Sequence, residues 1–180
     1  MIAAVLLACA ANVAPATLEA VIRVESGGDE LALHVNGVTL QPPRGRDATE
    51  VAGTAEDFIR RGYSVDLGLM QVNSRNLPAL GLTVAAVLEP CVNIRAGAAI
   101  LAADYALAVR MKGAGQKALL AALSAYNSGD FARGFANGYV ARFAGAAPSL
   151  SIPAQRQTSP DPAAADTSVY TREASHVRID

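Results

Sequence analysis

The 180-residue sequence contains only two cysteines and two histidines, no tryptophan, and 5% aromatic residues. So few histidines and cysteines are a poor supply of metal ligands, and neither His-Glu-x-x-His nor Cys-x-x-Cys occurs, so we expect no metal site. Also absent are Gly-x-Ser-x-Gly, which marks serine hydrolases, and a glycine-rich loop ending in Lys-Ser or Lys-Thr, which marks phosphate binding. We therefore expect no cofactor.

The charge and hydropathy exclude two further classes of protein. The net charge is −1 and the isoelectric point is near 6.1, whereas nucleic-acid binding usually needs a strongly basic face. The longest apolar run, Met1 to Ala11, is about half of the ~20 residues that a membrane-spanning helix needs. We expect no nucleic-acid partner and no transmembrane segment, although the mean hydropathy is +0.26.

The N-terminal apolar run and the two cysteines each have more than one interpretation. Leu6-Leu7-Ala8-Cys9 is similar to a lipid-attachment box at the end of a secretion signal, but no Lys or Arg precedes the run. The alternatives are a short core helix, or a start site that leaves the true signal upstream. Cys9 and Cys91 are either two buried thiols or, in an oxidising compartment, a disulfide.

A carboxylate occupies an unusual position in the first clear helix pattern. Pro15 is suited to begin this helix and Gly27-Gly28 to end it. Between them, Leu18, Val21 and Ile22 recur at helical spacing, and the next position of that stripe is Glu25. Burial and the helix C-terminus both favour a raised pKa for Glu25, as a general acid requires. The alternative is a boundary glutamate that reaches out to water.

The rest of the chain predicts further helices and little β-structure. Asn36-Gly37 favours a small hairpin between short β-favouring runs, and Asp66 to Asn73 is interpreted as a loop or short turn. Further helices are expected over residues 48–61, 83–88 (closed by Pro90), 91–111 and 116–126. The fold class is therefore mainly α, or α+β at most.

The composition changes near Ala147. Four of the nine prolines lie beyond it, among Ser, Thr, Gln and Ala with little apolar periodicity, which is typical of disordered segments. We therefore expect one domain over residues 1–147 and a disordered tail over residues 148–180.

Three segments, taken in order, carry a family resemblance. They are Glu25-Ser26-Gly27-Gly28, Gly68-Leu-Met-Gln-Val-Asn73 and Ala125-Tyr-Asn-Ser-Gly129. Their surroundings match as well: Val35-Asn-Gly37, Glu89-Pro-Cys91-x-Asn93 and Gly138-Tyr-Val140. Together they resemble the catalytic domain of lytic transglycosylases, in particular the subgroup of type IV secretion and conjugation systems. The match runs from about Cys9 to Val140.

The resemblance implies a lysozyme-like fold and a reaction on peptidoglycan. In this family a single glutamate, here Glu25, protonates the glycosidic oxygen between N-acetylmuramic acid and N-acetylglucosamine. The same group then acts as a base toward the C6 hydroxyl, and a 1,6-anhydro ring forms without water. One carboxyl with a raised pKa suits both steps, whereas the usual glycosidase pair needs two carboxyl groups.

The resemblance also implies substrate-binding positions, which are Ser26, Met70, Gln71, Tyr126, Asn127 and Tyr139. Met70 and Gln71 match positions that line the sugar cleft, with simple packing of the loop on the core as the alternative. Tyr126 is expected near the carboxyl of Glu25, Asn127 on a sugar, and Ser26 on the acetamido group or as a local cap. Neither His34 nor His176 matches a functional position.

Asp66 provides a rival mechanism. If it lay across a cleft from Glu25 it would activate water or act as a nucleophile, as in a hydrolysing lysozyme. The alternative, which we favour, is that Asp66 accepts hydrogen bonds from backbone amides and holds the Gly68 loop.

The resemblance finally implies a location and partners. It favours the core-helix interpretation of the N-terminus, a Cys9–Cys91 disulfide, and the periplasm, despite the absence of an obvious signal peptide. The expected partners are peptidoglycan glycan strands and secretion-channel subunits. The alternative from another class is a peptidoglycan-binding scaffold that recruits those subunits.

Overall fold

The computed structural model describes residues 2–144 and residue 152. Its helices are α1 (Ile2–Cys9), α2 (Pro15–Glu25), α3 (Ala48–Arg60), α4 (Leu77–Leu80), α5 (Val84–Val87), α6 (Pro90–Lys112), α7 (Gln116–Ser128) and α8 (Arg133–Ala136), with 3-10 turns η1 (Ser74–Asn76) and η2 (Val140–Phe143). Three short strands, β1 (Leu33–Val35), β2 (Val65–Leu67) and β3 (Val72–Asn73), form an antiparallel sheet in that order. The prediction of a mainly α fold is confirmed.

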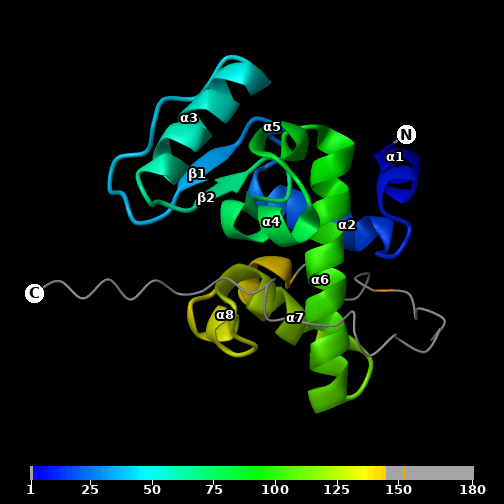
Figure 1. Ribbon diagram of the computed structural model, residues 1–180. Helices are drawn as coiled ribbons and strands as arrows, with labels where there is room; N and C mark the ends of the chain where they lie inside the picture. Colours follow the sequence, from blue (N-terminus) through cyan, green and yellow to red (C-terminus); the bar gives the residue numbers. More distant parts are fainter. Residues whose placement is uncertain (1, 145–151, 153–180) are drawn as a thin grey trace, which may run out of the picture.

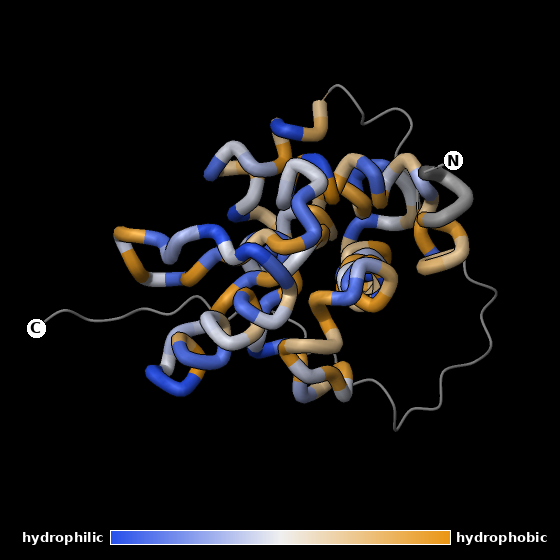
Figure 2. The backbone as a smooth tube through the Cα atoms, turned by 90° about the horizontal axis from the view of Figure 1, so that it is seen from above, coloured by the Kyte–Doolittle hydropathy of each residue, from blue (hydrophilic) through white to orange (hydrophobic). Residues whose placement is uncertain are grey.

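Helix α6 is the central element of the fold. Figure 1 shows it running through the described part of the chain, with the sheet and α3 toward one end and α7 and α8 toward the other. Figure 2 looks along α6 and shows the remaining elements arranged around it. By length and composition α6 would be able to cross a membrane, but half of its most apolar window is buried inside this fold. We therefore interpret α6 as a core helix.

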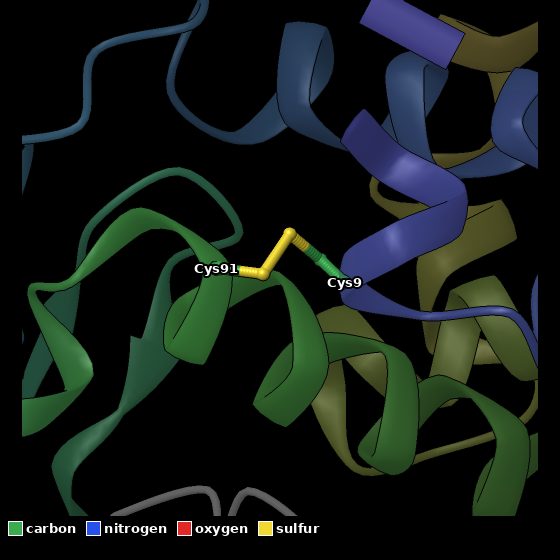
Figure 3. Close-up of a disulfide and its surroundings, with 2 residues drawn as sticks. All are labelled: Cys9 and Cys91. Atoms are coloured by element: carbon green, nitrogen blue, oxygen red, sulfur yellow. A yellow bond between two sulfur atoms is a disulfide. The ribbon is translucent and has the colours of Figure 1, made fainter. Parts of the chain in front are cut away.

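A disulfide joins the first helix to the central one. Cys9 at the end of α1 is bonded to Cys91 in the first turn of α6, with 5.1 Å between the two Cα atoms (Figure 3). Leu6 and Cys9 are buried in the core, as the core-helix interpretation predicts. The bond links positions 82 residues apart, so it lowers the conformational entropy of the unfolded chain and thereby stabilises the fold.

The predicted hairpin at Asn36-Gly37 is wrong. Strand β1 pairs with β2, so that Val35 lies opposite Val65, and no strand follows the turn directly. The reason is the side chain of Gln41, whose Oε1 accepts from Val35 N at 2.7 Å and whose Nε2 donates to Val35 O at 2.9 Å. A side-chain amide therefore satisfies the outer edge of β1 where a neighbouring strand would have paired.

The segment from Asp66 to Asn73 is more regular than the loop or short turn that the sequence predicts. It forms β2, a tight turn and β3, with Asp66 opposite Asn73 and Leu67 opposite Val72. The turn needs two residues with positive φ, Gly68 (70°) and Gln71 (47°). Only Gly68 is a glycine. The second position, Gln71, is a residue type that rarely has positive φ, so the sequence gives no local signal for this turn.

The helix boundaries agree closely with the sequence patterns. Helix α2 begins at Pro15 and ends just before Gly27, and Pro90 occupies the first position of α6. The predicted tail over residues 148–180 lies outside the described residues except for Ile152, which is half-buried against the core.

Candidate functional site

Glu25 is the last residue of α2 and is half-buried. Its Oε1 accepts a hydrogen bond of 2.5 Å from the hydroxyl of Tyr139, which directly precedes η2. Tyr139 is only 4% exposed, and its ring packs edge-on against that of Phe143, with 5.3 Å between the two ring centres. The carboxyl at the helix end is therefore oriented by a buried aromatic side chain that lies 114 residues away in the sequence.

Ser26 connects the end of α2 to the turn between β2 and β3. Its Oγ lies 2.8 Å from the carbonyl oxygen of Leu69 and 3.1 Å from that of Ile22, and it accepts from Gly28 N at 3.1 Å. The local-cap alternative describes part of this geometry. The contact with Leu69 adds a long-range connection, because it fixes the distance between Glu25 and the turn.

The turn itself is held by Asn93 of α6. Asn93 Oδ1 accepts from Met70 N at 2.8 Å, and its Nδ2 donates to the carbonyl oxygens of Leu67 (2.8 Å) and Val87 (2.9 Å). A Cβ atom on Gly68 would lie 2.4 Å from Asn93 Nδ2, so this contact requires glycine. The sequence pattern contained Asn93 within a motif but assigned it no role.

Met70 and Gln71 both point inward. The Met70 side chain is fully buried, as the core-packing alternative describes, so it offers no exposed surface to a ligand in this structure. Gln71 is 8% exposed, and its Nε2 donates to Gly68 O at 3.0 Å and to Ala32 O at 3.3 Å. These bonds support its positive φ, a conformation uncommon for residues other than glycine. A role of either residue in substrate binding stays a prediction.

The end of α7 lies on the other side of the turn. Tyr126 is 7% exposed and donates from its hydroxyl to Met70 O at 2.7 Å. Asn127 is half-buried, and its Oδ1 accepts from Asn137 Nδ2 at 3.0 Å. The structure thus joins Tyr126 to the Gly68–Gln71 turn, while Tyr139 supplies a hydroxyl to Glu25. The expected proximity of Tyr126 to that carboxyl stays a prediction.

Asp66 has a different environment from Glu25. It is 3% exposed on β2, where its two oxygens accept from the side-chain amides of Asn36 (3.0 Å) and Asn73 (2.7 Å). These two donors are side-chain amides, and the expected hydrogen bonds from backbone amides stay a prediction. Asp66 is therefore a buried acceptor that joins the strands of the sheet.

Two further polar residues were not found from the sequence. Arg142 of η2 donates from Nη2 to the carbonyl oxygen of Val24, next to Glu25. Asp104 of α6 is 2% exposed, and burial raises its pKa to about 7. The signal for Asp104 was its helical spacing from the apolar positions Leu101 and Ala108, and the signal for Arg142 was its spacing of three from Tyr139. Among the described residues, no group of three or more His, Cys, Asp or Glu side chains is arranged to hold a metal ion.

The chain is similar to one family of known proteins. The family described as "Transglycosylase SLT domain" matches residues 6–147. The chain is 44% identical over 147 residues to "Protein virB1" of Agrobacterium fabrum, covering 81% of this chain and 58% of that protein. It is 39% identical over 169 residues to "Type IV secretion system protein virB1" of Brucella suis, covering 87% and 70% respectively. No solved structure matches the chain significantly. The chain spans about three fifths of the length of the Agrobacterium relatives.

Proposed function

Because the chain belongs to the transglycosylase SLT domain family, whose fold is lysozyme-like, we propose that it is a peptidoglycan lytic transglycosylase with Glu25 as the only catalytic carboxyl group. The observation that carries this proposal is the contrast between the two candidate carboxylates. Glu25 is half-buried and oriented by the Tyr139 hydroxyl, while Asp66 is buried and accepts from two amides. Because both oxygens of Asp66 accept hydrogen bonds from amides inside the protein, we do not assign Asp66 the activation of a water molecule.

The reaction we propose has two proton transfers through one group. The Glu25 carboxyl first protonates the glycosidic oxygen between N-acetylmuramic acid and N-acetylglucosamine, and the C1–O bond breaks. The acetamido group of the muramic acid stabilises the positive charge that develops at C1. The Glu25 carboxylate then accepts the proton of the C6 hydroxyl while O6 bonds to C1. The products carry a 1,6-anhydro ring, Glu25 is protonated again, and no water is consumed.

The names of two relatives suggest the cellular process in which this reaction takes place. Because the Brucella proteins are named as type IV secretion system proteins, we place the cleavage at the assembly of such a channel, where it would open the peptidoglycan mesh locally. The disulfide favours an oxidising compartment, which supports the periplasm. Channel subunits are then the proposed protein partners. Alkylation of Cys9 and Cys91 in intact cells, with and without prior reduction, tests the compartment, because reduced thiols would contradict it.

The activity is tested by mass spectrometry of purified peptidoglycan digested with the wild-type chain and with Glu25→Gln. We expect anhydro-muropeptides from the wild type and none from the variant. Glu19→Gln is the matched control, because Glu19 is an exposed residue of the same helix and the chemical change is the same. Reducing-end products would instead indicate a hydrolase and would return Asp66 to the mechanism. Binding to peptidoglycan without any product would favour the scaffold alternative.

A further inference from the structure

Arg142 makes two contacts that converge on the Tyr139–Glu25 pair. Its Nη2 donates to the carbonyl oxygen of Val24, the residue before Glu25. Its guanidinium carbon also lies 5.9 Å from the centre of the Tyr139 ring, within the range of a cation–π contact. The ring that orients the carboxyl and the backbone that carries it are therefore held by the same side chain.

The local backbone explains this geometry. Tyr139 is the residue before η2 and Arg142 is the third residue of that turn, with Arg142 N donating to Tyr139 O at 3.0 Å. In a 3-10 turn, side chains three positions apart lie over one another. The spacing Tyr-x-x-Arg thus presents a ring and a cation on one side of η2.

The end of α2 needs such a partner. The last carbonyl groups of a helix lack intrahelical donors, and a positive charge at this end is favourable. Arg142 supplies both to Val24, from a segment 118 residues away. Val24 therefore contacts Arg142, Arg142 contacts Tyr139, and Tyr139 bonds to the carboxyl of Glu25, the residue after Val24.

We propose that Arg142 is a positioning residue, which fixes the Glu25 carboxyl by holding the Tyr139 ring and the last turn of α2. This inference rests on the proposed function, because it assigns Arg142 a role in the reaction of Glu25. Arg142 is exposed overall, and contacts of exposed arginines contribute little to global stability. Its effect is therefore expected in the geometry of the carboxyl rather than in the stability of the fold.

The test is a double-mutant cycle with steady-state kinetics on purified peptidoglycan strands. Arg142→Gln is expected to lower kcat about tenfold, as misplacement of a catalytic group does, with KM changed less than about twofold. Because Arg142 acts through Tyr139, the same substitution in a Tyr139→Phe background is expected to lower kcat by less than about twofold. Arg142→Lys keeps a charged donor and is expected to retain more activity than Arg142→Gln. Arg23→Gln, at an exposed arginine in the last turn of α2, is the control and is expected to change kcat little.

Several outcomes would overturn the role of Arg142. A higher KM with unchanged kcat would identify a substrate contact, and additive losses in the cycle would show that Arg142 and Tyr139 act independently. A fall in melting temperature that accounts for the lost activity would indicate a structural role only. A wild-type chain that forms no anhydro products would contradict the proposed function itself, whereas an active wild type with unaffected variants would contradict only the role of Arg142.

Discussion

The end of α2 and the β2–β3 hairpin each carry one carboxylate, and the two carboxylates have opposite environments. At the end of α2, Glu25 is half-buried and bonded to the hydroxyl of a side chain from another segment. In the hairpin, Asp66 is 3% exposed and joined to side-chain amides of Asn36 and Asn73. The first environment leaves a carboxyl that is oriented but reachable. The second uses the carboxylate as an internal link of the sheet.

Two carboxylates that both occur in sequence motifs can therefore have different environments in the folded protein, and we base their proposed roles on the environment. A buried carboxylate that accepts hydrogen bonds from two side-chain amides contributes to the fold. A half-buried carboxylate at a helix end keeps part of its surface exposed to solvent. The sequence singled out both residues, and the structure separates them by exposure and by donor type.

Neutralising Glu25 is expected to have the largest effect on activity. Glu25→Gln is expected to lower turnover of peptidoglycan by about a thousandfold, because a general acid typically contributes 10²–10⁴-fold and here the same group would serve both steps. The free energy of unfolding is expected to change little, since the amide keeps the acceptor for Tyr139. Turnover and urea denaturation measured on the same preparation check both statements. Comparable turnover in wild type and variant would remove Glu25 from the mechanism.

Removing the carboxylate of Asp66 is expected to have the converse profile. Asp66→Ala removes the acceptor of the buried Asn73 amide and one of the two acceptors of the half-buried Asn36 amide, which keeps its bond to Ser64 O. A buried unsatisfied donor costs about 1–3 kcal/mol, so we expect the free energy of unfolding to fall by about that amount, while the folded fraction still forms anhydro products. Asp57→Ala, at an exposed carboxylate of α3, is the control for the lost charge. An inactive but fully stable Asp66→Ala variant would contradict a structural role of Asp66.

Asp104 is a third carboxyl group with an environment of its own: burial raises its pKa from an ordinary value of 3.8 to about 7. Because the folded-state pKa is the higher one, the folded protein binds this proton more tightly than the unfolded chain does. The stability that this group contributes is present below pH 3.8 and is lost as the pH rises to about 7. Asp104→Asn is therefore expected to stabilise the protein by a few kcal/mol at pH 8, at about 1.4 kcal/mol per pKa unit, and hardly at pH 4.

The measurement for Asp104 is the difference between the unfolding free energies of variant and wild type across this pH range. Taking the difference removes the contributions of the other titrating groups, which both proteins share. Asp57→Asn is the control, since that carboxylate is exposed. A difference that does not change with pH would mean that Asp104 has an ordinary pKa in the folded protein.

Elements with local signals were predicted well from the sequence, and elements with distant partners were not. Helix α2 follows from Pro15, the glycines after Glu25 and the apolar stripe between them, all within one segment. The partner of β1 could not be found in this way, because β2 begins 30 positions after Val35 and the Gln41 side chain occupies the outer edge of β1. Nothing in the local pattern distinguishes a glutamine that covers an edge from one in solvent.

The candidate site shows the same division. The position of Glu25 at a helix end was predicted from periodicity, and the Cys9–Cys91 disulfide from the family resemblance; the structure has both. The contacts around Glu25 were not predicted. The hydroxyl of Tyr139 bonds to Glu25, and that of Tyr126 to Met70, because the packing of η2 and α7 sets their places. The contact of Arg142 with Val24 was missed for the same reason, since Val24 lies 118 residues away in the sequence.

The smallest expected effect tests how tightly the hairpin turn is packed, compared with the rest of the fold. A Cβ atom on Gly97 of α6 would lie 2.7 Å from both Cβ and Sδ of Met70 and 2.9 Å from the Tyr126 hydroxyl oxygen. Gly97→Ala is therefore expected to lower the free energy of unfolding by about 1–3 kcal/mol, the usual cost of overpacking. Gly53→Ala on α3 is the matched control, because a Cβ there meets nothing within 4 Å, and it is expected to stabilise the helix by about 0.5–1 kcal/mol.

Opposite signs for the same substitution would show that the turn beside Glu25 is held by close packing. If both variants were stabilised, the turn would have room to move, and close packing of Met70 against α6 would not hold the hairpin in place.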